Sequence, residues 1–196
     1  MRIFRKYKSN IHEKGFVHRD FHSGNILKGD GFDALITDLG LSRPADQDQK
    51  DNTIHGVLPY VAPEVLMKNK YTEKSDIYSL GMICYEVIAG IPPFHDVPHQ
   101  AHLAFDIIKG LRPKFKIKVP KKIHEMIYEW WLDLDVPNFD SEFYKQYDEA
   151  DTDKHDLTDL QESTNNQLVY TTHVQAVYRS RVLDIPSSML CDDEGM

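Results

Sequence analysis

The chain has 196 residues with 41% hydrophobic content, enough for one domain of ordinary size or for one lobe of a larger domain with a tail. Its formal net charge of -8 argues against a general nucleic-acid-binding surface, because phosphate backbones are bound by clustered Lys and Arg. Two cysteines in unrelated contexts predict neither a disulfide framework nor a zinc site. The most apolar run, residues 80–91, contains Glu86 and is too short to span a bilayer.

The first predicted elements flank a polar loop. Residues 7–14 have the pattern of a helix's last turns, with Gly15 as the stop, and Phe16 and Val17 open a short strand. Beyond the loop, residues 26–27 and 34–36 are predicted to pair as a hairpin, because a Gly-Asp-Gly turn signal lies between them.

Surface loops and helices follow. Residues 42–53 are polar and lack periodicity, which predicts a surface loop. Residues 74–90 are apolar on most of a helical circumference and predict a helix buried at the centre. Two amphipathic helices are expected, one at about residues 99–111 and one from Lys121, whose Trp and Met side chains we interpret as core.

The composition turns acidic after residue 131. We therefore divide the chain into a folded part at residues 1–138 and an acidic, partly disordered tail at residues 139–196. Within the tail, residues 174–182 alternate enough to dock as a strand or a short helix.

Two polar motifs carry the chemistry. Residues 18–25 read H-R-D-F-H-S-G-N, and residues 38–40 read D-L-G. Phosphoryl transfer to a hydroxyl needs a carboxylate that accepts the hydroxyl proton and a second carboxylate that holds magnesium, and an amide can complete the metal shell. Asp20, Asp38 and Asn25 are placed for these three roles.

The motifs resemble those of the protein kinase family, whose signature is H-R-D-L-x-x-x-N, then D-F-G, then A-P-E. The A-P-E triplet stands at residues 62–64, and D-I-Y-S-L-G follows at residues 76–81 on the predicted buried helix. The resemblance covers roughly residues 1–131 and corresponds to the C-terminal lobe of a kinase. It implies an α+β fold that is mainly helical, with short β-hairpins around the catalytic loop.

The resemblance also implies roles for individual residues. Asp20 would be the catalytic base, and Asp76 would hold the catalytic loop from below. ATP and Mg²⁺ would be the cofactors. The remaining implied site residues are Arg19, which can meet a phosphate or acid in the activation loop, His22 in the catalytic loop, Asn25 and Asp38 as magnesium ligands, and Gly40 in the nucleotide site.

Among kinases, the chain is most similar to fungal tyrosine-kinase-like enzymes. The segments that carry this likeness are I-T-D-L-G-L-S at residues 36–42 and G-V-L-P-Y-V-A-P-E at residues 56–64. Tyr60 stands where dedicated tyrosine kinases usually carry Trp, which favours Ser/Thr over Tyr as the acceptor.

Several positions depart from the family pattern. His22 replaces a Lys and offers one donor without a fixed charge. Leu39 replaces Phe, a swap that packing should tolerate. Val57 stands where a Thr often supports the catalytic Asp. Glu64 in the family pairs with an Arg near the end of the lobe, and residues 130–138 contain none. Either another group serves Glu64 or the lobe is weakened.

The chain contains no Gly-rich phosphate loop, strand Lys or helix Glu before the catalytic loop. We therefore expect the N-terminal lobe to be absent, its docking surface to be exposed, and these residues alone to show no ATP-dependent phosphorylation. Two alternatives stay open. The first is a pseudokinase or regulatory fragment that docks on another kinase. The second is a small-molecule phosphotransferase, which would lack the A-P-E triplet and the Asp-anchored helix.

The partners expected on this interpretation are a protein substrate and either a second kinase or the missing lobe, with no nucleic acid and no membrane, in the cytoplasm. Histidines without metal-ligand spacing are assigned to the surface by default. They are His55, His95, His99, His102 and His124.

Overall fold

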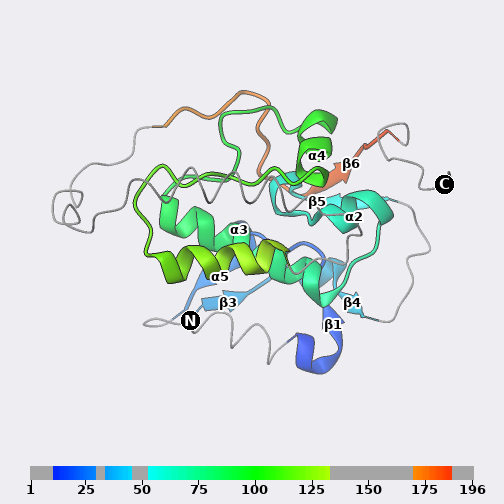
Figure 1. Cartoon of the computed structure of the whole chain (residues 1–196). Helices are drawn as coiled ribbons and strands as arrows, with labels where there is room; N and C mark the ends of the chain where they lie inside the picture. Colours follow the sequence, from blue (N-terminus) through cyan, green and yellow to red (C-terminus); the bar gives the residue numbers. More distant parts are fainter. Residues whose placement is uncertain (1–10, 30–33, 46–52, 133–169, 187–196) are drawn as a thin grey trace, which may run out of the picture.

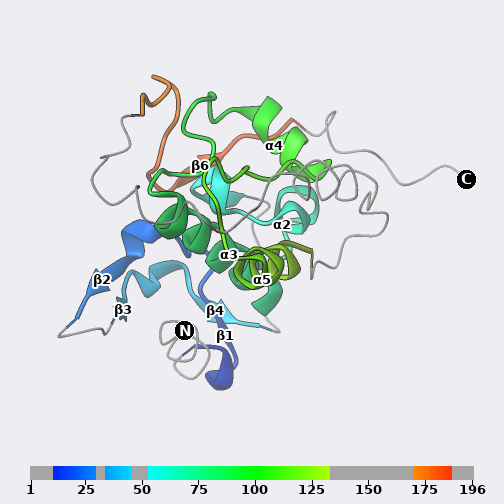
Figure 2. The same ribbon diagram turned by 60° about the vertical axis from the view of Figure 1, so that its left-hand side comes forward.

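The computed structural model describes residues 11–29, 34–45, 53–132 and 170–186. At its centre, helix α3 (Glu73–Ala89) lies beside helix α5 (Lys121–Leu132), as Figures 1 and 2 both show. A second packed pair joins α2 (Pro63–Lys68) to α4 (Ala101–Ile108). The prediction of a mixed fold dominated by helices therefore holds for the described residues.

Helix α3 has clear start and stop signals. The Thr72 hydroxyl accepts from the Ser75 N–H, the Ser75 hydroxyl accepts from the Thr72 N–H, and this capping box fixes the first turn. Gly90 ends the helix in the left-handed conformation, with φ +70°. Most of the helix circumference is buried, as its apolar pattern predicts.

Within the described residues, six short strands form three antiparallel pairs. Their bounds are Phe16–Val17 (β1), Ile26–Lys28 (β2), Ala34–Ile36 (β3), Arg43–Pro44 (β4), Ile54–Gly56 (β5) and Arg181–Leu183 (β6). The pairs are β1 with β4, β2 with β3, and β5 with β6. Short 3-10 turns lie at His12–Lys14, Ser23–Asn25, Leu39–Leu41 and Leu58–Tyr60.

The predicted hairpin and the strand after Gly15 are confirmed. The loop prediction for residues 42–53 is wrong at Arg43–Pro44, which pairs with β1, and residues 46–52 lie outside the described part. The third helix is core as predicted, but its fully buried side chains are Ile127, Tyr128 and Trp131.

The segment 170–186 belongs to the folded body. The predicted docking of residues 174–182 is confirmed in kind, because β6 pairs with β5. Residues 139–169 and 187–196, the rest of the predicted tail, lie outside the described residues. The surface assignment is wrong for His95 and His99, which are buried and contact residues of this segment.

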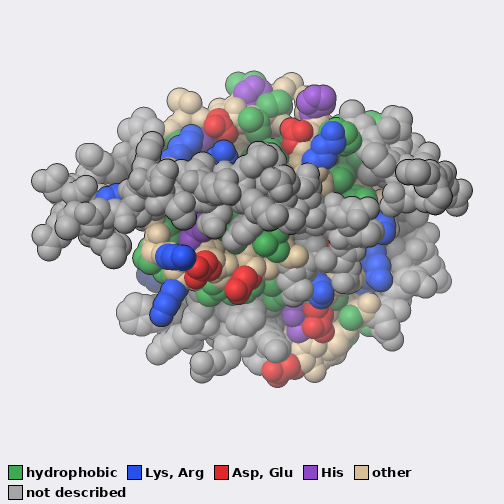
Figure 3. Space-filling view, viewed as in Figure 1, with side chains coloured by type: hydrophobic (Ala, Val, Ile, Leu, Met, Phe, Trp, Pro, Cys, Tyr) green, Lys and Arg blue, Asp and Glu red, His purple; other side chains and the backbone are tan. Residues whose placement is uncertain are grey.

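Among the described residues, no helix is both long enough and apolar enough to cross a membrane. On the face shown in Figure 3, acidic and basic side chains alternate and no single sign of charge gathers. Exposed apolar side chains do occur on the β2–β3 hairpin and after it, at Leu27, Leu35 and Leu39. The predicted exposure of apolar surface is therefore seen on the hairpin side.

Candidate active site

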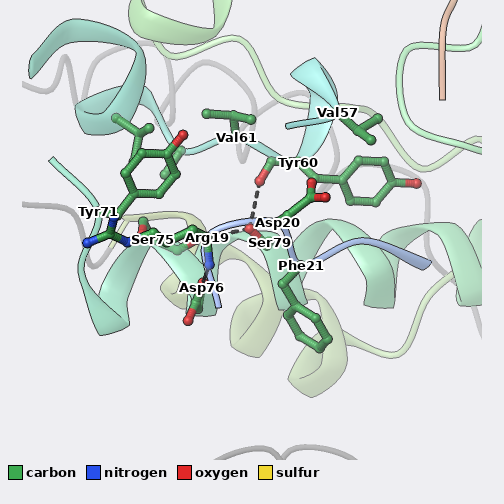
Figure 4. Close-up of a pocket in the computed structure, with 12 residues that line it drawn as sticks. Arg19, Asp20, Phe21, Val57, Tyr60, Val61, Tyr71, Ser75, Asp76 and Ser79 are labelled. Carbon is green, nitrogen blue, oxygen red and sulfur yellow. Dashed lines mark hydrogen bonds between the residues drawn. The ribbon is translucent and has the colours of Figure 1, made fainter. Parts of the chain in front are cut away.

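The catalytic loop, residues 18–25, is anchored on a buried carboxylate of helix α3. Asp76 Oδ2 accepts the His18 N–H at 2.8 Å, and Oδ1 accepts the Arg19 N–H at 3.1 Å. His12 Nε2 lies 3.0 Å from Oδ2. Figure 4 shows Asp76 directly below Arg19. The role predicted for Asp76, to hold the loop from below, is confirmed by these contacts.

His18 ties the loop to the segment that carries Asp38. Its ring is fully buried, and Nε2 lies 3.1 Å from the Thr37 carbonyl, to which Nε2–H donates. That tautomer leaves Nδ1 as an acceptor for the Asp20 N–H at 3.4 Å. The loop backbone and the residue before Asp38 are thus held by one side chain.

Asp20 presents an unengaged oxygen. The residue is 5% exposed, and Oδ1 accepts no hydrogen bond from any residue that the structure describes. Asp20 and Val57 line a cavity of about 10 Å³, room for one water at most (Figure 4). Because Val57 has no hydroxyl, it cannot donate to this carboxylate, as its sequence position predicts.

His22 faces Asp20 as a neutral donor. Its Nδ1 accepts the Gly24 N–H at 3.1 Å, so the ring proton sits on Nε2, which lies 3.8 Å from Asp20 Oδ1. Burial lowers the pKa of His22, and the negative charge of Asp20 only partly opposes that shift. His22 therefore carries no fixed charge at neutral pH.

Asn25 and Asp38 are brought together by the hairpin. Asn25 directly precedes β2, and its carbonyl accepts the Thr37 N–H at 2.9 Å and the Thr37 hydroxyl at 3.2 Å. Asp38 comes one residue after Thr37, so both predicted ligands lie at the same end of the hairpin. The Asn25 amide donates to the Asp20 carbonyl at 2.8 Å, which orients its Oδ1 away from that bond.

The D-L-G segment is open to solvent. Asp38 has φ +59°, and a Cβ on Gly40 would stand 3.4 Å from Asp38 Oδ1. Leu39 is half exposed, so the predicted packing of this residue is not seen among the described residues. No group of three or more His, Cys, Asp or Glu side chains that could hold a metal occurs in the described ranges.

Arg19 lies against the activation-segment side of α3. Its backbone is left-handed at φ +72°, and its guanidinium carbon is 5.4 Å from the centre of the Tyr71 ring. Burial lowers the pKa of Arg19, whereas the nearby Tyr71 and Asp76 act in the opposite direction. Arg19 is predicted to meet a phosphate or acid in the activation loop, and residues 46–52 of the polar loop 42–53 lie outside the described part, so this stays a prediction.

A buried cation stands near Glu64, although the sequence offered none at the family position. Glu64 and Arg112 are both buried. Burial lowers the pKa of Arg112, and its electrostatic interactions with Tyr78 and with Glu64 oppose that shift. Arg112 also donates to the carbonyls of Ile107 and Leu111. Of the two alternatives, a weakened lobe or another group that compensates the Glu64 charge, the second is supported, with Arg112 as that group.

The end of the activation segment is fixed to α3 by contacts that sequence reasoning missed. The Ser79 hydroxyl donates to the Tyr60 carbonyl at 2.6 Å, the bond drawn in Figure 4. The Tyr60 hydroxyl donates to Glu86 Oε2 at 2.7 Å. The sequence signal for these two contacts is the i, i+7 spacing of Ser79 and Glu86, which places both side chains on the same face of α3.

Comparison with known families agrees with this arrangement. The protein kinase domain matches residues 9–194. The chain belongs to the protein kinase family.

Relatives of this chain are Ser/Thr protein kinases by name. A probable serine/threonine-protein kinase of Dictyostelium discoideum is 36% identical over 118 residues, which cover 60% of this chain and 7% of that protein. The serine/threonine-protein kinase sgk-1 of Caenorhabditis elegans is 36% identical over 111 residues, covering 56% of this chain and 24% of its own length. The chain thus spans a quarter or less of these relatives.

Proposed function

We propose that this chain provides the catalytic lobe for ATP-dependent phosphoryl transfer to Ser or Thr of a protein substrate. Asp20 is the base that orients the acceptor hydroxyl and takes its proton. The observation that carries the proposal is the buried Asp20 Oδ1, which has no hydrogen-bond donor among the described residues. A buried carboxylate oxygen without a donor is costly and is the acceptor that an incoming hydroxyl requires.

The residues at the hairpin end fit a magnesium nucleotide. Mg²⁺ keeps several waters and is held by one or two protein oxygens together with substrate phosphates, so a cluster of three acidic ligands is unnecessary. Asp38 offers a carboxylate and Asn25 an amide oxygen at the same end of the hairpin. Bound MgATP would supply the phosphoryl group and neutralise its charge. Gly40 keeps the backbone beside Asp38 free of a side chain.

Two further residues have supporting roles in the proposal. His22 Nε2 lies 3.8 Å from Asp20 Oδ1, so this neutral side chain is the donor that helps to orient the carboxylate. Arg19 receives an acid or a phosphate from the activation loop. Tyr60 in place of Trp supports Ser/Thr acceptors, as do the names of the relatives. The likeness to fungal tyrosine-kinase-like enzymes, the absence of the N-terminal lobe and a cytoplasmic location stay predictions.

The test separates metal binding from turnover. Mn²⁺ with ATP should broaden the methyl NMR signals of Leu39 and Leu41 in the 196-residue chain, and Asp38→Asn should remove the effect. Phosphorylation of a generic protein acceptor should be absent for the chain alone. It should appear when a lobe with a Gly-rich loop and a strand Lys is supplied, and Asp20→Asn should then abolish it. Turnover that survives Asp20→Asn contradicts the proposal.

The alternative, a regulatory fragment that docks on another kinase, is favoured by the half-exposed Leu27, Leu35 and Leu39. Its test is association with a purified kinase partner. On the regulatory interpretation, binding survives the double change Asp20→Asn and Asp38→Asn but is lost in Leu27→Asp. On the catalytic interpretation, the partner that restores turnover is a lobe with a Gly-rich loop and a strand Lys, and the restored turnover is lost when Asp20 or Asp38 is changed.

A further inference from the structure

The described residues 170–186, which we call the strap, return over the lobe and end in β6. In Figures 1 and 2, β6 lies beside β5 next to α2 and α4. The pairing is antiparallel, with Ile54 opposite Leu183 and Gly56 opposite Arg181. Strand β5 lies between the D-L-G and A-P-E motifs, so the strap covers the segment that leads out of the active site.

The covered strand passes close to the Asp20 carboxylate. Gly56 has φ +142°, and a Cβ built there would lie 3.7 Å from Asp20 Oδ1 and 2.8 Å from Val61 Cγ2. Only glycine fits this conformation and this space. An extended segment paired with Gly56 therefore lies beside the residue that borders Asp20 Oδ1, the oxygen that we assign to the acceptor hydroxyl.

Strand β5 has one edge already satisfied. The Tyr71 hydroxyl accepts the His55 N–H at 3.2 Å and donates to the His55 carbonyl at 2.9 Å. Because backbone groups alternate in direction along a strand, those of Ile54 and Gly56 point to the opposite edge, where β6 lies. This edge offers backbone N–H and C=O groups to which any extended peptide could hydrogen-bond. In this chain, β6 of the strap occupies the edge.

The strap is held by polar contacts around His99. The His99 N–H donates to the Gln175 carbonyl at 3.0 Å, and His99 Nδ1 accepts the Val177 N–H at 3.0 Å. An Arg181 guanidinium N–H donates to the His99 carbonyl. The Tyr178 hydroxyl donates to the Pro93 carbonyl at 2.8 Å.

Little of the strap is buried. Of the side chains in residues 170–186, Leu183 is buried, and Tyr178 and Ile185 are half-buried against the core. Val174 is 94% and Val182 is 59% exposed. The hydrogen bonds that hold the strap can be exchanged for bonds to water or to another strand at small net cost in free energy. A segment with one buried and two half-buried apolar side chains is therefore the kind that opens locally.

We propose that the strap is an autoinhibitory strand, which closes the β5 edge beside Asp20 and must leave before an extended peptide can pair there. The peptide that replaces it has the chemistry of β6, with a basic residue opposite Gly56 and an apolar residue of leucine size opposite Ile54. The inhibitory effect rests on the proposed function, because it concerns access to Asp20. The exchange of the strap for another strand does not depend on the proposed function.

The first test measures strand exchange with the whole chain and without turnover. The probe is a fluorescein-labelled synthetic peptide with the sequence of residues 176–186, and binding is followed by anisotropy. A tethered strap acts at an effective concentration on the order of millimolar, so the wild type should bind the peptide poorly. Leu183→Asp should raise the affinity by about tenfold or more. Val174→Asp, the same charge change at an exposed strap position, should match the wild type.

Hydrogen exchange at Ile54 and Gly56 gives a second reading. These amides should lose protection in Leu183→Asp and keep it in Val174→Asp. Arg181→Pro, which removes an N–H directed at β5, should act like Leu183→Asp. Equal peptide affinity in the wild type and Leu183→Asp overturns the proposal. The proposal is also wrong if Leu183→Asp and Arg181→Pro lose protection throughout α3, because the strap would then be part of the core.

A third reading concerns inhibition itself. In an assay in which phosphoryl transfer is measurable, Leu183→Asp should raise kcat/KM for a protein acceptor severalfold, and Val174→Asp should not. Unchanged kcat/KM despite tighter peptide binding means that the strap does not inhibit. If Asp20→Asn leaves turnover intact, the proposed function fails, and the strand exchange is still decided by the anisotropy result.

Discussion

The catalytic loop and the strap are attached to the same lobe by different means. The loop is fixed by one buried carboxylate, Asp76, which accepts two backbone N–H groups in a site closed to water. The strap is fixed mainly by neutral hydrogen bonds around His99, with one charged bond from Arg181 to the His99 carbonyl. Its apolar contacts are the buried Leu183 and the half-buried Tyr178 and Ile185. Charged hydrogen bonds in a buried site are strong, and their loss leaves orphaned groups, whereas neutral bonds near solvent exchange easily. The comparison indicates a permanent frame for the loop and a releasable attachment for the strap.

Removal of the loop's anchor should have the largest effect. Asp76→Ala leaves the N–H groups of His18 and Arg19 buried without acceptors and should lower the free energy of unfolding by about 3–5 kcal/mol. Urea denaturation followed by circular dichroism measures the loss. Glu73→Ala is the matched control on the same helix, and its half-exposed carboxylate, 4.0 Å from His12, should cost under about 0.5 kcal/mol. If the two variants lost similar amounts of unfolding free energy, the buried Asp76 carboxylate would be no more important to stability than a surface carboxylate.

The core beneath the loop depends on close packing at Gly81. A Cβ there would lie 2.6 Å from Trp131 Nε1 and 2.8 Å from Trp131 Cδ1, across the contact between α3 and α5. Overpacking costs about 1–3 kcal/mol, and the gain in helix propensity from Ala returns up to about 1 kcal/mol. Gly81→Ala should therefore destabilise the lobe by about 1–2 kcal/mol in thermal and urea unfolding.

A double-mutant cycle isolates this contact. In a Trp131→Leu background, Gly81→Ala should cost little or stabilise, because the indole edge is gone. An equal cost in both backgrounds would mean that the helix contact is not the cause.

The frame of the site could be predicted from the sequence, because its residues form compact motifs with strong local signals. The apolar circumference of residues 74–90 predicts the buried helix, and Asp76 follows from the resemblance. The Gly-rich turn signal between β2 and β3 predicts the hairpin that places Asn25 near Asp38. These features depend on nearby residues, for which periodicity and turn chemistry are reliable guides.

The strap and the partner of Glu64 could not be predicted in the same way. The pairing of Leu183 with Ile54 joins residues far apart in the chain, and β6 is too short for its alternation to specify a partner. Arg112, the buried cation whose pKa the Glu64 charge raises, lies about 20 residues before the stretch in which the family carries its Arg, so the motif does not locate it. His99 was assigned to the surface because no local pattern shows that a distant segment covers it.

The attachment of the strap should weaken as the pH falls. Burial lowers the pKa of His99, with Arg181 and His173 acting in the same direction and the carbonyls of Val177 and Phe94 opposing it. The detached His99 takes up a proton more readily than the docked one, so docking is favoured above about pH 6.5 and is progressively lost below it. A protonated Nδ1 no longer accepts the Val177 N–H and instead donates to the Val177 carbonyl at 3.0 Å, which offsets part of the loss.

Protection factors for the Val177 amide, corrected for intrinsic exchange, should therefore fall severalfold between about pH 7.5 and 5.5. His99→Gln should flatten this dependence. The exposed His102→Gln should leave it unchanged. A pH dependence that persists in His99→Gln would place the titrating group elsewhere in the lobe.

The smallest expected effect is a null result that separates the strap from the core. Cys84 is buried on α3, and burial raises the pKa of its thiol to about 12, so it reacts with a thiol reagent only when the core opens. In a Cys191→Ser background, Leu183→Asp should leave the labelling rate of Cys84 within about twofold of the parent, because the strap opens without the core. Gly81→Ala should raise the rate about tenfold, since about 1.4 kcal/mol of lost stability is a factor of ten in the open population. Equal acceleration by the two variants would show that strap and core open as one cooperative unit, and a strand that leaves only when the core unfolds cannot control access to Asp20.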